Sequence, residues 1–137
     1  MDHTIYIHKL FNFIQPHLGV KEFAKVDHHN CRFGKWWETG LGKQEFSKTA
    51  SYPKVEAPHA QVHSSANAIA AFGNDLINLV ENEKAIADYL DAVIHGSKNV
   101  FTYIESMMDE KAVTLEADTH LRIQKYEEEV GLSAKTE

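Results

Sequence analysis

Apolar residues at helical spacing are the feature that most limits what this chain can form. They recur at steps of three and four from position 2 to 17, from 58 to 80 and from 86 to 107. That period places an apolar stripe along one face of each of three helices, and no segment shows the convincing alternation of a strand. The stripes consist of His3, Tyr6, Ile7, Leu10, Phe13, Ile14 and His17, then Val62, Ala66, Ile69, Gly73, Leu76 and Val80, then Ile86, Leu90, Val93, Ser97, Val100, Ile104 and Met107.

The segments between and after these helices differ in character. Pro16 predicts that the first helix ends near Gln15, with a short helical segment at 21–26. Residues 34–58 hold three of the seven glycines and two of the three prolines, which predicts a loop region with short helical turns. Residues 109–130 are highly charged, as in a solvated helix or one that needs a partner. The expected fold is all-α, an antiparallel four-helix bundle with a loop-rich connection and an additional short helix.

We expect a helical bundle domain at 2–107, followed by a charged C-terminal helix and tail at 108–137. The chain has 14 basic and 20 acidic residues, and no stretch gathers the basic residues into a stripe, so nucleic acid is not an expected partner. The longest apolar runs are four or five residues, which predicts no membrane segment in this chain. A single cysteine fits a reducing compartment, and we expect a cytoplasmic protein.

Nine histidines in 137 residues are the anomaly of the composition. His59 and His63 are four apart and share one helix face, where they continue the apolar stripe, and His3 lies on the stripe of the first helix. Buried polar groups need partners, and one cation would satisfy all three imidazoles at once. Cys31 as thiolate would complete three nitrogens and one sulfur, a ligand set that zinc accepts in tetrahedral geometry.

Three motifs carry a resemblance to a known family: DHTIY at 2–6, CRFGKW at 31–36 and PHAQVH at 58–63. Over about 2–104 the chain resembles the chemoreceptor zinc-binding (CZB) domains. That family's pattern is a histidine near the start of the first helix, a C-R-hydrophobic-G-K-W block, and H-x-x-x-H. The resemblance implies a four-helix bundle that holds Zn²⁺ through His3, Cys31, His59 and His63.

A closed site with four protein ligands leaves no position for a substrate water, so we expect a sensory or regulatory domain and not an enzyme. The resemblance implies two inputs, zinc itself and hypochlorous acid acting on the Cys31 thiolate, and the sequence leaves both open. It also implies a signalling output module, either a chemoreceptor in chemotaxis or a diguanylate cyclase that makes cyclic-di-GMP. The charged helix after Asp109 is a candidate for dimerisation or for carrying the signal onward. We expect a homodimer.

Residues around the motifs have expected roles. Gly34 lets the backbone approach the metal loop closely, and Trp36 and Trp37 belong to the core or to a lid. His28 and His29 are expected to be exposed. An acidic residue, Asp2 or Glu56, could orient an imidazole of the site.

Two rival functions are weighed against the zinc site. A hemerythrin-like di-iron bundle needs H-x-x-x-E, but the residue four after His63 is Asn67 and the residue four after His95 is Asn99. A histidine phosphotransfer domain would use His95, but the lysine that such domains place after the histidine is not in register. His8, His17, His95 and His120 are expected to have no role in metal binding.

Overall fold

The structure, a computed structural model, describes residues 2–131. These residues form α-helices and short 3-10 helices, with no strand among them, which confirms the all-α prediction for this part of the chain. The elements are α1 (Asp2–Phe13), η1 (Pro16–Leu18), α2 (Arg32–Thr39), α3 (Leu41–Phe46), η2 (Tyr52–Val55), α4 (Glu56–Ala71), α5 (Leu76–Glu81) and α6 (Glu83–Val130). None of these helices is both long enough and apolar enough to cross a membrane.

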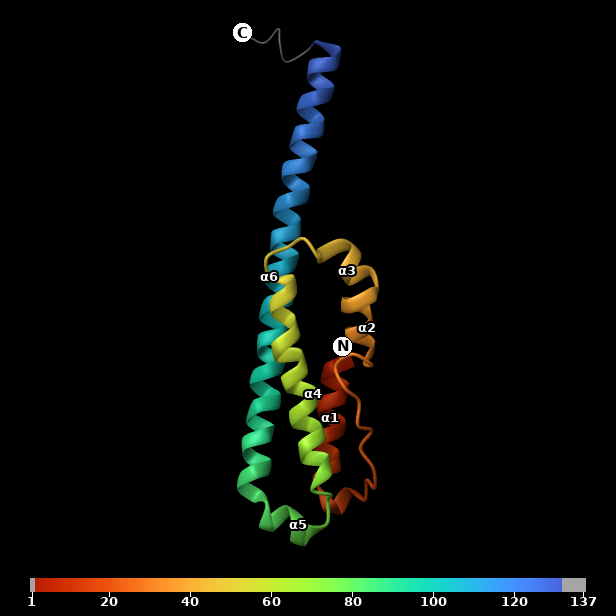
Figure 1. Ribbon diagram of the computed structural model, residues 1–137, viewed down its shortest axis with the longest axis vertical. Coiled ribbons are helices and arrows are strands. Elements are labelled where there is room, and N and C mark those ends of the chain that lie inside the picture. Colours follow the sequence, from red (N-terminus) through yellow and green to blue (C-terminus); the bar gives the residue numbers. More distant parts are fainter. Residues whose placement is uncertain (1, 132–137) are drawn as a thin grey trace.

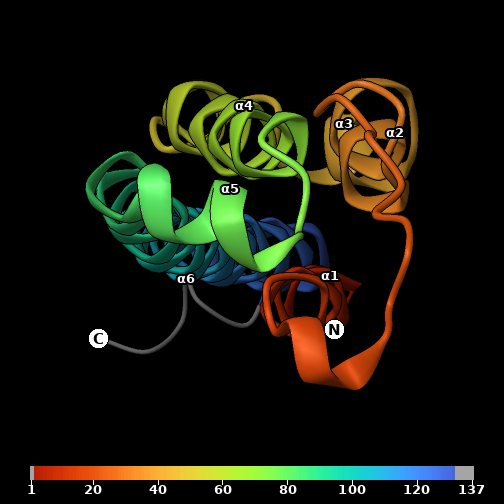
Figure 2. The ribbon, with the colours of Figure 1, turned by 90° about the horizontal axis from the view of Figure 1, so that it is seen from below.

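The chain order and the directions of the helices place α1 and the start of α2 beside the same part of α4. α1 and α4 run toward the α5 end of the molecule, and α6 returns along α4 in the opposite direction (Figure 1). Seen along the long axis, α1, α4, α6 and the α2–α3 pair occupy separate positions around the centre (Figure 2). The beginning of α1 therefore lies beside the turn that precedes α2.

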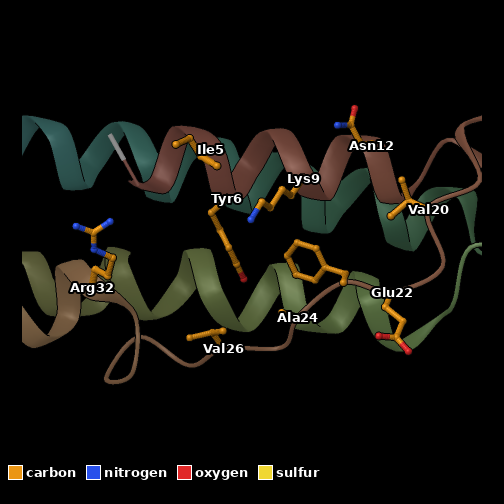
Figure 3. A pocket seen from close by; sticks show the side chains of 10 residues that line it. Ile5, Tyr6, Lys9, Asn12, Val20, Glu22, Ala24, Val26 and Arg32 are labelled. Carbon is orange, nitrogen blue, oxygen red and sulfur yellow. The ribbon is translucent and has the colours of Figure 1, made fainter.

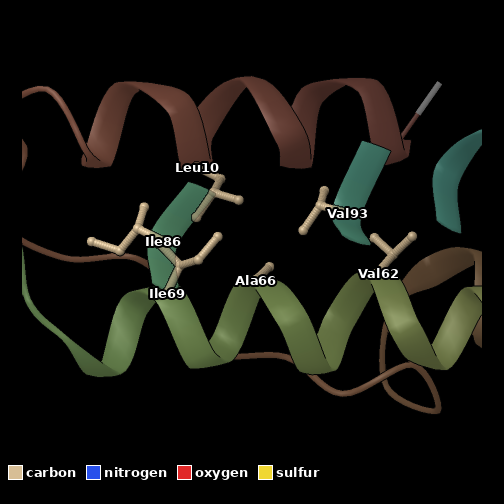
Figure 4. Close-up of a cluster of buried hydrophobic side chains, with 6 residues drawn as sticks. All are labelled: Leu10, Val62, Ala66, Ile69, Ile86 and Val93. Carbon is tan, nitrogen blue, oxygen red and sulfur yellow. The ribbon is translucent and has the colours of Figure 1, made fainter. Parts of the chain in front are cut away.

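The main core lies where α1, α4 and α6 meet, and its members are the residues that the helical period placed on one face (Figure 4). No side chain in this cluster is more than 6% exposed, and burial of each of its Leu, Ile and Val side chains contributes about 1.5–3 kcal/mol. Gly96 lets α6 approach α4 closely, because a Cβ there would lie 3.0 Å from the Pro58 carbonyl oxygen and from Val62 Cγ2. The cluster consists of Leu10, Val62, Ala66, Ile69, Ile86 and Val93.

A second buried cluster lies beside α2 and the middle of α6. Trp37 belongs to it, which confirms a core role, and its indole Nε1–H donates to the Tyr52 carbonyl at 3.2 Å. Trp36 is half-buried against this cluster. The buried members are Trp37, Val55, Val100, Ile104 and Met107.

The prediction that one helix covers 58–80 is wrong beyond position 71. Gly73 takes a left-handed φ of 75°, and its N–H donates to the Ala70 carbonyl at 3.1 Å, an arrangement that ends helices. The apolar stripe ends there as well, because Leu76 is 66% exposed and Val80 is 62% exposed. Gly73, although it lies on the apolar stripe, therefore marks the end of the helix.

The short helix expected at 21–26 is also wrong, since this segment has no regular secondary structure. It runs back along α1 toward the start of α2 (Figure 1). An extended chain covers about 3.3 Å per residue against 1.5 Å in a helix, so it makes the return with few residues. The Phe23 ring packs against Tyr6 and Phe13, with ring centroids 5.2 and 6.1 Å away.

The predicted loop at 34–58 contains two α-helices, α2 and α3, as well as η2. Its glycines serve close packing here: a Cβ on Gly40 would lie 2.9 Å from Trp36 Cα, and one on Gly42 would lie 2.7 Å from the Trp36 ring. η2 is joined to α6 through Ser51, whose N–H and hydroxyl donate to the Glu110 carboxylate at 2.9 and 2.7 Å.

α6 is a single helix of 48 residues, which corresponds to about 72 Å. It runs without a break across the boundary predicted between residues 107 and 108, and the division into domains stays a prediction. Beyond Lys111, which pairs with Glu45 at 3.6 Å, the helix extends past the other elements (Figure 1).

Candidate metal centre

The four residues predicted as ligands lie together in the structure. His3 comes from the first turn of α1, Cys31 precedes α2, and His59 and His63 lie one turn apart on α4. His3 is 4% exposed and the other two histidines are 1% exposed, while Cys31 is half-buried. The side chains offer one ligand atom each, and these four atoms lie within 4.8 Å of one another. Residues 28 positions apart thus meet at one point.

The spacing of the donor atoms fits a tetrahedral zinc site. Bonds of about 2.3 Å to sulfur and about 2.05 Å to nitrogen require sulfur–nitrogen separations of about 3.6 Å. Cys31 Sγ lies 3.2 Å from His59 Nε2 and 3.7 Å from His3 Nε2, on either side of that value. These two sulfur–nitrogen separations are therefore close to those that a bound zinc ion requires.

His63 provides the clearest sign that a partner belongs in the cluster. Its Nδ1 lies 2.9 Å from the Val26 carbonyl oxygen. A carbonyl only accepts, so Nδ1 carries the proton and Nε2 keeps a lone pair. Nε2 is buried and has no hydrogen-bond partner among the described residues. A buried acceptor without a donor costs about 1–3 kcal/mol, and a cation would satisfy it.

The environment keeps the α4 histidines neutral, the form that binds metal. Burial, and after it the neighbouring His3 and His63, lowers the pKa of His59 from 6.5 to about 3. Burial, and after it His3, lowers the pKa of His63 to about 4, although its hydrogen bond to Val26 acts in the opposite direction. At neutral pH both imidazoles therefore present lone pairs and not N–H⁺ groups.

Cys31 is held at the N-terminus of α2, where its Sγ accepts a hydrogen bond from the Gly34 N–H at 3.2 Å. The positive end of a helix favours a negatively charged sulfur. Gly34 is required here, because a Cβ at this position would lie 1.9 Å from the His28 carbonyl oxygen. The prediction that Gly34 permits a close approach to the metal loop is confirmed, and the C-R-F-G spacing has a steric cause.

Aromatic rings surround the cluster on two sides. Tyr6 packs against His63 with ring centroids 4.7 Å apart, and Phe33 packs edge-on against His59 at 5.0 Å. Burial, and after it Cys31, raises the pKa of Tyr6. These rings help to bury the three imidazoles, whereas Cys31 is half-buried.

The structure corrects several expectations about the neighbourhood. His28 is half-buried and not exposed, whereas His29 is exposed as predicted. Glu56 does not orient any of the four residues; it accepts from His28 Nε2 at 2.7 Å. The side chain of Asp2 lies outside what the structure describes. The group that orients His63 is the backbone carbonyl of Val26, for which the sequence contains no signal.

A groove of about 520 Å³ lies between α1 and the extended segment 20–26 (Figure 3). Tyr6 projects from α1 toward α4 (Figure 3), and its ring packs against that of His63 with centroids 4.7 Å apart. The groove is largely apolar and contains none of the four candidate ligands. It is therefore distinct from the metal centre.

The di-iron rival finds no support in the described residues. His95 is exposed on α6, where its Nδ1–H donates to the Asp91 carbonyl at 2.8 Å, and it belongs to neither of the metal-type clusters found in residues 2–131. No carboxylate belongs to the cluster of His3, His59 and His63. A di-iron centre requires such bridging carboxylates.

Comparison with known proteins supports the same interpretation. Residues 3–70 match the sequence profile of the chemoreceptor zinc-binding domain. No curated protein and no solved structure matches the chain. The matched range begins at His3 and includes all four residues of the cluster.

Proposed function

We propose that this chain, whose residues 3–70 belong to the chemoreceptor zinc-binding domain family, binds one Zn²⁺ ion through His3, Cys31, His59 and His63 and acts as a sensory domain. The observation that carries the proposal is the buried, unpartnered Nε2 of His63 in a cluster of three imidazoles and one sulfur. Four protein ligands leave no open coordination position, so the domain has no hydrolytic role.

Occupancy of the site would determine how the helices sit together. The ligands come from α1, from the turn before α2 and from α4, three elements that the chain connects only through extended or short helical segments. When bound, zinc supplies a charge that joins these elements. Without the ion, several neutral imidazoles converge in a small volume, so metal binding favours the closed arrangement over a looser one. We infer that α1, α4, α6 and the α2–α3 pair form the antiparallel four-helix bundle expected of the family.

The second input is oxidation of Cys31. Cys31 is half-buried, whereas the three histidines are buried, and we infer that a small oxidant reaches its sulfur. Hypochlorous acid would transfer oxygen to the thiolate, giving sulfenic acid and chloride; sulfur loses two electrons and chlorine gains them. The sulfenic acid carries less negative charge than the thiolate, so it binds the cation less strongly. Oxidation therefore weakens the contact between α1, α2 and α4 that zinc binding stabilises.

Zinc content of single variants tests the ligand set. Cys31→Ala should lower zinc affinity while the far-UV circular dichroism stays helical, and His63→Ala should lower it further. The exposed His95→Ala variant is the matched control and should keep the wild-type content. Zinc content equal to wild type in both ligand variants would remove Cys31 and His63 from the site. Hypochlorous acid should release zinc from the wild-type protein, and a control sample from which a chelator has already removed the zinc should release none. Such release would separate the oxidant input from simple zinc sensing.

We further propose that the exposed end of α6 pairs with a second copy of the chain and passes the signal to a chemoreceptor or diguanylate cyclase partner. Past Met108 its apolar side chains remain exposed; Leu115 is 52% exposed, Ile123 is 53% exposed and Tyr126 is 62% exposed. Steps of three and four place these residues on one face of the helix. That stripe consists of Met108, Ala112, Leu115, Thr119, Ile123, Tyr126 and Val130.

Analytical ultracentrifugation of the full chain tests the homodimer. Leu115→Glu on the stripe should shift the chain toward monomer, whereas Glu116→Gln, which is outside the stripe, should not. A wild-type monomer at high concentration would refute the pairing without affecting the zinc proposal.

A further inference from the structure

A second cluster of metal-binding side chains lies beside the first. It consists of His28 and His29 in the turn before Cys31, Glu38 at the end of α2 and Glu56 at the start of α4. Each offers one ligand atom, and these four atoms lie within 4.8 Å of one another. From these positions we propose that the chain binds a second Zn²⁺ ion here, in an exchangeable site of two imidazoles and two carboxylates.

The turn that supplies both histidines is held in place by its own contacts. The Asp27 carboxylate accepts from the backbone N–H groups of His29 and Asn30 at 3.0 and 2.9 Å. Gly34 presses against the His28 carbonyl, and no side chain would fit between them. The histidine rings lie against each other with centroids 3.9 Å apart. The two imidazoles are therefore positioned before any ion arrives.

The two carboxylates approach this pair from different elements. His28 Nε2 lies 2.7 Å from Glu56 Oε1, and His29 Nδ1 forms a very short contact with a carboxylate oxygen of Glu38. Two separate histidine–carboxylate pairs would explain each contact alone. Two independent pairs have no reason to place all four ligand atoms together, whereas binding of one cation requires that all four atoms converge on one point. Neutral imidazole and carboxylate are ligands that zinc accepts, and two carboxylates balance the charge of a divalent ion.

Exposure distinguishes this site from the metal centre described above. The His28 side chain is 17% exposed and that of Glu38 is 29% exposed, but Glu56 is 41% and His29 is 55% exposed. Water reaches the ligands, so an ion here exchanges more readily than one in the closed site. The two centres are neighbours, since the rings of His28 and His59 pack edge-on at 5.6 Å. The same turn and the same helix, α4, supply ligands to both.

Calorimetric titration of the reduced, metal-stripped full chain without a polyhistidine tag tests the proposal, with ZnCl₂ as the probe. Wild type should take up a tight and a weaker equivalent. Either His29→Ala or Glu38→Gln, both at exposed or half-exposed positions, should weaken the second equivalent roughly tenfold or more and leave the first unchanged, because each removes a direct ligand. Glu45→Gln is a matched control on the neighbouring helix and should retain both.

Cobalt spectra separate this proposal from the three-histidine, one-cysteine site. The first equivalent of Co²⁺ should bring a thiolate-to-metal band, and the second should add visible absorption without further thiolate intensity. In His63→Ala the second site should persist while the first is weakened. A single equivalent in wild type, or a second equivalent that survives unchanged in His29→Ala and Glu38→Gln, would overturn the second site and leave the first intact.

Discussion

The metal-free protein should lose stability on mild acidification because of His59 and His63. Both are 1% exposed, and their folded pKa values are about 3 and about 4 against 6.5 for an unperturbed histidine. Below pH 6.5 the unfolded chain therefore binds protons at these positions that the folded chain does not bind. The sign follows directly: the free energy of unfolding falls as the pH falls.

The size of the effect depends only on both folded pKa values lying below about 5. From about pH 7.5 to about pH 5.5, each histidine then contributes a loss of about 1.4 kcal/mol, or about 3 kcal/mol for the pair. That is a large fraction of the 5–15 kcal/mol that stabilises a typical domain. Asp27 and Glu110 do not titrate in this range, because hydrogen bonds lower their pKa values below the ordinary 3.8 and 4.5.

Urea denaturation of the reduced, metal-stripped chain at the two pH values measures the loss. His29 acts in the opposite direction, since the Glu38 carboxylate raises its pKa, so its contribution is present at low pH and is lost as the pH rises. The comparison is therefore repeated in Glu38→Gln, where the loss should be at least as large. His63→Gln should remove about half of it. A free energy of unfolding that is unchanged or higher at the lower pH would refute the assignment of buried, neutral imidazoles.

Three further outcomes follow from the packing. Gly34→Ala should weaken zinc binding roughly tenfold or more, because a Cβ 1.9 Å from the His28 carbonyl displaces the turn that carries Cys31; wild-type affinity in a competition titration would contradict this. Leu10→Ala should cost about 2–5 kcal/mol in urea denaturation, while Ile5→Ala, at a position 55% exposed, should stay within about 0.5 kcal/mol; equal losses would argue against the assigned core. Chelation should lower the Tm of wild type more than that of His63→Ala, in which zinc binding is already weakened, and differential scanning calorimetry can measure both shifts.

Where local spacing decides the structure, the sequence was sufficient. The stripes on α1, α4 and α6 predicted buried Leu10, Val62, Ile69 and Val93, because a helix brings residues three and four apart to one face whatever lies around it. The pair of His59 and His63 follows from the same rule. The stripe of the first helix also marked His3, whereas Cys31 lies on no stripe and was added by its ligand chemistry and by the family motifs.

Where a residue has two local interpretations, the sequence was misleading. Gly73 fitted the apolar stripe of α4 and also the left-handed end of a helix, and the structure shows the second. The glycines at 40 and 42 suggested a loop, although each is a point of close contact within a helical region. A glycine in the sequence is equally consistent with a flexible loop and with a tightly packed helix. Only the residues that surround it in the folded structure distinguish these two cases.

From the sequence alone come the helical class of this chain, the core faces of its three main helices and a set of soft and imidazole ligands suited to zinc. Only the tertiary structure oriented His63 through the Val26 carbonyl and joined His28, His29, Glu38 and Glu56 into a second cluster. The physical reason is that helical periodicity is a property of neighbouring residues, whereas a meeting of side chains from a turn and two helices depends on how those elements pack, and no repeat along the chain encodes that.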